Sequence, residues 1–147
     1  MAVRAKPDGY HSVTPYLVVE GAGELIDFIK RAFGAEEVMR LEAPGGQVGH
    51  AELRIGDSRV MLGDAQGTHT PTRAMLHLYV DDADAVYRRA LAAGATSEQE
   101  PADQFYGDRS GGVRDKWGNR WWIATHVEDV PPDELRRRAE AAMRKAG

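Results

Sequence analysis

The 147-residue chain contains no cysteine, which excludes disulfide bridges, thiolate catalysis and thiolate zinc sites. It also lacks an apolar run long enough to span a membrane, and residues 1–9 lack the apolar stretch of a secretory signal. Nor is there a basic excess, because the formal net charge of −4 gives no electrostatic argument for nucleic-acid binding. We therefore expect a cytoplasmic globular protein that binds neither membranes nor nucleic acid.

What the chain does contain is an internal repeat. Residues 13–63 and residues 74–124 each predict a strand, a helix and three further strands. The strongest echo is LVVEGA at residues 17–22 against LYVDDA at residues 78–83, where an apolar strand runs into an acidic turn. One half alone could bury only one face of a small sheet, whereas two halves can pair and enclose a space. We expect the function to reside in that space.

Periodicity and turn residues predict one domain of the α+β class. Its module 1 covers about residues 12–64, a polar linker residues 65–73, module 2 about residues 74–126, and a C-terminal helix about residues 131–145. Residues 105–112 mix aromatic, charged and glycine residues, and they predict a loop that can approach a ligand closely.

Six short motifs together resemble one known family. They are TPYLVV (14–19), DFIKRAFGA (27–35), IGDS (55–58), VDDADA (80–85), YGDR (106–109) and DKWGNRWW (115–122). In their order and spacing they resemble the vicinal oxygen chelate superfamily of glyoxalases and bleomycin-resistance proteins, and within it the PhnB-like branch. The resemblance implies two βαβββ modules that form a cupped mixed sheet, the glyoxalase/bleomycin-resistance fold. It also implies a homodimer whose pockets lie between the halves.

The same resemblance implies four metal-ligand positions, on the first and last strand of each half. Here they fall on Thr14, Met61, Met75 and Trp122. Zinc binds through imidazole, thiolate or carboxylate and hard cations bind through oxygen, so two thioethers and an indole do not suit a divalent ion. We therefore predict no metal and no cofactor. The departure also argues against glyoxalase, dioxygenase and metal-dependent epimerase chemistry.

Sulfur and aromatic groups at these positions indicate the wall of a pocket instead. Trp121 and Trp122 are neighbours on a predicted strand, so one packs under the helices and the other faces the enclosed space. Met61 and Met75 either add soft, adaptable walls or simply fill the core. Further predicted ligand contacts are Thr14 and Tyr16, in the first motif, and His50.

Polar candidates accompany these walls. His50 and Glu52 share one strand face, and they either form a hydrogen-bonded polar surface or hold a metal or relay a proton. His77, on the same face as Met75, is either a structural histidine or a ligand contact or general base.

The predicted loop adds two candidates. Tyr106 and Arg109 either close over a ligand, with Arg109 pairing with an anionic group, or form only a surface turn.

Two functions follow. The first is a metal-free binding protein that sequesters a largely apolar or aromatic small molecule; resemblance to bleomycin-resistance proteins implies an antibiotic or other natural product. The second is a lyase or isomerase that acts on a small oxygenated substrate. It would use His77 or Glu52 as base, or a metal held by His50, Glu52 and His77. The sequence leaves open whether the chain is an enzyme.

Overall fold

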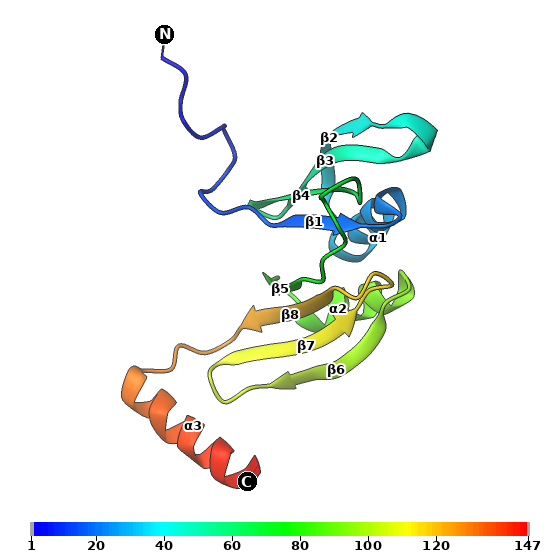
Figure 1. The fold of residues 1–147 in the computed structure, drawn as a ribbon. Helices are drawn as coiled ribbons and strands as arrows, with labels where there is room; N and C mark the ends of the chain where they lie inside the picture. The colour runs from blue at the N-terminus through cyan, green and yellow to red at the C-terminus, as the bar shows by residue number, and fades with distance from the viewer. Residues whose placement is uncertain (1, 147) are drawn as a thin grey trace. The chain divides into compact units, whose positions relative to one another are not determined.

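The computed structural model describes residues 2–146, which fall into two compact units that divide between Ala74 and Met75. Each unit is a βαβββ module with one four-stranded mixed sheet (Figure 1). In the sheet of unit 1 the strand order is β1-β4-β3-β2, and in unit 2 it is β5-β8-β7-β6. β1 pairs in parallel with β4, and β5 pairs in parallel with β8. All other neighbouring strands are antiparallel.

The elements of unit 1 are β1 (Tyr16–Val19), α1 (Ala22–Phe33), β2 (Glu36–Glu42), a 3-10 turn η1 (Pro44–Gly46), β3 (Val48–Ile55) and β4 (Ser58–Asp64). The elements of unit 2 are β5 (Met75–Tyr79), α2 (Ala83–Ala92), β6 (Thr96–Asp103), β7 (Asp108–Arg114), β8 (Arg120–His126) and α3 (Pro132–Ala146). These two modules and the C-terminal helix confirm the predicted α+β fold class. No helix among residues 2–146 is long and apolar enough to cross a membrane.

The register of the parallel strands shows how closely the two units repeat. Tyr16 lies opposite Met61 in unit 1, and His77 lies opposite Trp122 in unit 2. Tyr16 and His77 are therefore separated in the sequence by the same number of residues as Met61 and Trp122. Corresponding positions of the two sheets can be compared directly on this basis.

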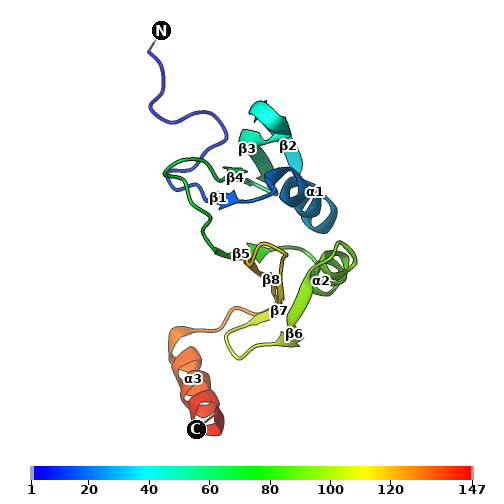
Figure 2. The same ribbon diagram turned by 45° about the vertical axis from the view of Figure 1, so that its right-hand side comes forward.

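Each sheet has an open face, here the one turned away from the helix of its own unit, and buries the other face under that helix (Figure 2). In unit 1, α1 packs Leu25, Ile26 and Ile29 against that face, and all three side chains are buried. The helix ends because Gly34 adopts a left-handed φ of 67° and donates its N–H to the Lys30 carbonyl. In unit 2, Trp121 is buried, which confirms that it points to the opposite side from the half-buried Trp122.

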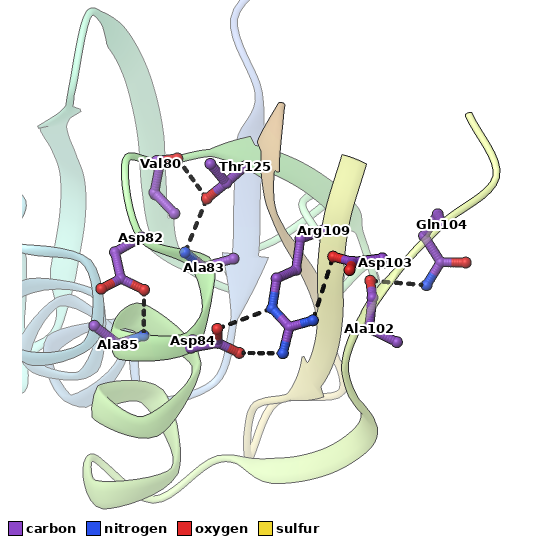
Figure 3. Close-up of polar contacts among 10 residues, drawn as sticks. All are labelled: Val80, Asp82, Ala83, Asp84, Ala85, Ala102, Asp103, Gln104, Arg109 and Thr125. Carbon is purple, nitrogen blue, oxygen red and sulfur yellow. Dashed lines mark hydrogen bonds and ion pairs between the residues drawn. The ribbon is translucent and has the colours of Figure 1, made fainter. Parts of the chain in front are cut away.

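A side chain at the end of the last strand fixes each strand-to-helix junction. The Asp64 carboxylate accepts hydrogen bonds from the backbone N–H groups of Gly21, Ala22 and Val48 at 2.8–3.0 Å. Burial alone would raise the pKa of Asp64, but the three donors outweigh it and the net direction is downward. At the equivalent junction of unit 2, the Thr125 hydroxyl accepts from Ala83 N–H and donates to the Val80 carbonyl (Figure 3).

The prediction of a loop over residues 105–112 is wrong for most of this segment, because strand β7 begins at Asp108. Glycine and serine have low strand propensity, but pairing with β8 on one side and β6 on the other overrides it. The glycines are needed for close packing. A Cβ at Gly112 would lie 2.2 Å from the Trp122 ring, and one at Gly111 would lie 2.9 Å from the Gln99 carbonyl.

Candidate functional site

The open face of unit 1 carries a row of hydrogen-bonded side chains. His50 and Glu52 alternate with buried residues on β3, so both lie on the face turned away from α1. The Tyr16 hydroxyl lies 3.1 Å from His50 Nδ1, and His50 Nε2 lies 2.8 Å from Glu52 Oε2. The Tyr10 hydroxyl donates to the other Glu52 oxygen. The structure thus brings two predicted ligand contacts, Tyr16 and His50, together on one face of the sheet.

The segment before β1 forms a pocket beside this row. The pocket has a volume of about 430 Å³ and is lined by Ala5, Lys6, Pro7, Tyr10, His11, Ser12, Thr14 and Met61. Two predicted ligand-binding residues, Thr14 and Met61, are therefore part of one concave surface. The segment is held down at Tyr10, whose ring lies 5.3 Å from the guanidinium carbon of Arg59 in a cation–π contact. The contribution of this segment to the pocket could not be predicted from the sequence, because residues 1–9 show no periodicity.

The open face of unit 2 presents aromatic groups in register. His77 lies opposite Trp122, and the Trp122 ring covers Gly112 on the next strand. The His77 ring centroid lies 4.9 Å from that of Tyr79, two residues along β5. Met75 is more than half exposed at the start of the same strand. Met75, His77 and Trp122 therefore share one face, as their positions predicted.

Sequence reasoning missed a buried carboxylate at the edge of this face. Asp108 is only 3% exposed, and it accepts hydrogen bonds from the Tyr79 hydroxyl and from His126 Nδ1, both at 2.8 Å. His126 Nε2 bonds in turn to Asp129 at 2.7 Å. Burial would raise the pKa of Asp108, but the bonds from His126 and Tyr79 reverse the direction and lower it. The bond to Asp108 raises the pKa of Tyr79.

Arg109 and Tyr106 lie apart from these aromatic groups. Arg109 points to the α2 side of the sheet, where Nε and Nη2 reach the two Asp84 oxygens at 2.9 and 3.2 Å (Figure 3). A third contact runs from Nη1 to Asp103 at 3.3 Å. Tyr106 lies in the turn before β7, where its ring meets that of Phe105 edge-on. The guanidinium thus has two carboxylate partners, and the structure does not bring it together with Trp122.

The four positions that correspond to metal ligands do not fit a divalent ion. Thr14 offers one neutral oxygen, Met61 and Met75 offer thioethers, and Trp122 offers an indole. Over residues 2–146, no group of three or more His, Asp or Glu side chains lies close enough together to hold a metal. The donor set therefore supports no step that runs through a metal.

The contacts of His126 predict a pH-dependent contribution to stability. Its hydrogen bonds to Asp108 and then Asp129 raise the pKa of His126 above its ordinary value. A raised folded-state pKa stabilises the fold fully below the unfolded-state value of about 6.5, and this contribution is lost as pH rises through the folded-state value. We expect His126→Gln to lower the free energy of unfolding more at pH 6 than at pH 9.

Urea unfolding of both proteins at the two pH values measures this difference. His69→Gln, in the segment between β4 and β5, is the matched control for the loss of an imidazole elsewhere in the chain. An effect of His126→Gln that is the same at pH 6 and pH 9 would show that the imidazolium does not hold the two carboxylates.

Comparisons with known proteins agree with this fold. Residues 9–123 match the Glyoxalase/Bleomycin resistance protein/Dioxygenase superfamily. The chain is 39% identical to the uncharacterised protein Rv0887c of Mycobacterium tuberculosis over 158 aligned positions, which cover all of this chain and 88% of that protein. It is equally similar to the uncharacterised protein Mb0911c of Mycobacterium bovis, of which it covers 99%.

Solved structures show the same architecture. TioX from Micromonospora sp. ML1 superposes with a TM-score of 0.69 and 28% identity, over 80% of this chain and 99% of that one. A PhnB protein from Bacillus cereus has a TM-score of 0.64 at 19% identity, over 78% of this chain and 99% of that one, and shares the fold. The chain therefore belongs to the glyoxalase/bleomycin resistance/dioxygenase superfamily, as its motifs predicted.

Proposed function

We propose that this protein binds and sequesters a largely apolar or aromatic small molecule without a metal. The observation that carries the proposal is the pocket of unit 1, where Met61 and Tyr10 form an apolar wall beside the Thr14 hydroxyl. Its volume lies within the range of small-molecule sites. Each 100 Å² of apolar ligand surface buried there contributes about 2.5 kcal/mol before the entropic cost of association.

The ligand class follows from the family rather than from the pocket alone. The superfamily description includes bleomycin resistance proteins, so an antibiotic or other natural product is the proposed ligand and sequestration the proposed role. Within unit 2, His77 and Trp122 form an aromatic face on which a flat molecule can stack. A homodimer, a single domain and a cytoplasmic location stay predictions.

Binding of a neutral apolar dye tests the proposal. N-phenyl-1-naphthylamine brightens in apolar sites, and we expect a saturable increase in fluorescence with the wild-type protein. Met61→Gln keeps the length of the side chain but removes its apolar character, and should weaken the affinity about five- to tenfold, which corresponds to about 1–1.4 kcal/mol. The measurement is a fluorescence titration at fixed protein concentration.

The matched control is Met143→Gln, which alters an exposed methionine of α3 and should leave the affinity unchanged. Absence of saturable binding to the wild-type protein, or equal weakening by both substitutions, would contradict a site at Met61.

The row on β3 supports a second candidate function, a lyase or isomerase. In neutral imidazole protonated at Nε2, His50 donates to Glu52 and accepts from Tyr16, so the three groups can pass a proton along the face. Catalysis would therefore depend on Glu52 even without a metal. Turnover of small oxygenated substrates by the wild-type protein but not by Glu52→Gln would favour this function over sequestration.

A further inference from the structure

The lining of the pocket of unit 1 includes a cationic side chain, Lys6, and no acidic one. Lys6 and His11 belong to its lining, and none of the eight described lining residues is Asp or Glu. We propose that this pocket selects ligands that carry an anionic group, such as a carboxylate or sulfonate, on an apolar or aromatic body. The inference rests on the proposed function, because it names the chemistry of the ligand bound at that same site.

A half-buried cation next to the pocket, Arg59, strengthens the argument because one of its nitrogens is buried. The Arg59 guanidinium lies directly under the segment before β1, where a Cβ on Gly9 would come within 2.6 Å of Nη2. It also contacts the ring of Tyr10, which lines the pocket. Arg59 Nη1 is buried and has no hydrogen-bond partner within the described part of the chain. An unpaired buried N–H of a charged group is costly, and an anion that reaches it supplies the missing acceptor.

Two carboxylates beside the groups that contact Arg59 have other partners: Asp8 is next to Gly9, and Glu52 is bonded to Tyr10. Asp8 pairs with Arg4 at 2.7 Å. Glu52 accepts from Tyr10 through one oxygen and from His50 through the other. Within the described residues, neither carboxylate forms an ion pair with Arg59.

The net charge makes the expected preference a local one. With a formal net charge of −4, the protein as a whole repels anions. Its overall charge would therefore favour binding of a neutral ligand over an anionic ligand of the same shape. A measured preference for the anion would have to come from the groups that surround the pocket.

Two dyes with the same ring skeleton test the proposal. 1-Anilinonaphthalene-8-sulfonate carries one sulfonate, and N-phenyl-1-naphthylamine is its uncharged counterpart. We expect the wild-type protein to bind the sulfonate about tenfold more tightly than the neutral dye in a fluorescence titration at low salt. This ratio should shrink in 0.5 M NaCl, because salt screens the attraction between partly exposed charges.

Substitutions assign the preference to Arg59. Arg59→Met should lower the affinity ratio to about one, whereas Arg59→Lys keeps the charge and should retain most of it. Arg54→Met is the matched control, because Arg54 lies opposite Arg59 on β3 and pairs with Glu36. Its ratio should equal that of the wild-type protein. Thermal unfolding of each variant confirms that it is folded.

The outcomes separate the two claims. If neither dye binds saturably, the proposed pocket is wrong. If both dyes bind with equal affinity, or if Arg59→Met and Arg54→Met keep the same preference for the sulfonate, the pocket stands and the anion selectivity at Arg59 is overturned.

Discussion

Replacement of Asp115 by alanine is expected to destabilise the protein by about 3–5 kcal/mol, the effect of breaking a buried charged network. Asp115 is 5% exposed, and it closes the turn between β7 and β8. One carboxylate oxygen accepts from the backbone N–H groups of Trp117 and Asn119, both at 2.9 Å. The other oxygen accepts from Asn119 Nδ2 at 3.1 Å and from the Trp121 indole at 2.9 Å.

The cost is large because these donors stay buried after the substitution. Asn119 and Trp121 are both almost fully buried, so their N–H groups cannot turn to solvent. Urea unfolding measures the change. The matched control is Asp57→Ala in the corresponding turn of unit 1. This aspartate is exposed, and within residues 2–146 its side chain accepts one hydrogen bond, from Ser58, so we expect a change within about 0.5 kcal/mol. Equal effects at both aspartates would contradict the buried network.

Replacement of Gly107 by alanine should cost about 3 kcal/mol or more, for two independent reasons. The φ of Gly107 is +98°, a conformation that residues with a side chain rarely adopt. In addition, a Cβ would lie 2.2 Å from the Glu128 carbonyl oxygen, which belongs to the backbone and cannot rotate away. The Gly107 carbonyl accepts hydrogen bonds from Val127 and Glu128, so movement of this turn would disturb the segment before α3.

Gly45→Ala separates the two reasons. Gly45 has a similar φ of +80°, but no atom lies within 4 Å of the position of a Cβ. We therefore expect Gly45→Ala to lower the free energy of unfolding by only about 1–2 kcal/mol, which is the effect of the unfavourable conformation alone. Urea unfolding midpoints compare the variants. A cost at Gly107 no greater than that at Gly45 would show that the turn relaxes away from Glu128.

The same turn positions α3, which has no buried side chain among its described residues. Arg138 on this helix donates to both Glu128 oxygens at 2.9 Å and to the Phe105 carbonyl at 3.1 Å. The hydrogen bonds to Glu128 and Glu134 raise the pKa of Arg138. The helix is thus tied to unit 2 through polar contacts, in keeping with the thin apolar stripe in its sequence.

Local patterns were sufficient to predict the helices and strands of each module, whereas the glyoxalase/bleomycin-resistance fold was implied by the family resemblance. The apolar period of α1 and the stop at Gly34 depend only on neighbouring residues, and the repeat between the modules supplied the second copy. The pair His50 and Glu52 was also predictable, because alternation on a strand places residues two apart on one face. What these cases share is that the partners lie within a few residues of each other.

The missed parts of the candidate sites depend on contacts between distant residues. Tyr10 and Glu52 are 42 positions apart, and Asp108 and His126 are 18 apart. The pair Asp108 and His126 was missed because the glycines of β7 led us to predict a loop there. The pairing of β7 with β8 places Asp108 opposite His126, and only the recognition of residues 108–112 as a strand would have revealed that register. The segment before β1 carried no comparable signal.

The most direct test of the proposed pocket is a titration followed at the methionine methyl groups. With ¹³C-labelled methionine methyls, addition of 1-anilinonaphthalene-8-sulfonate should shift the Met61 resonance saturably, because Met61 lines the pocket. The Met143 resonance on α3 should stay in place, because Met143 is not among the residues that line the pocket. A Met61 resonance that does not move while the dye is bound would contradict the account.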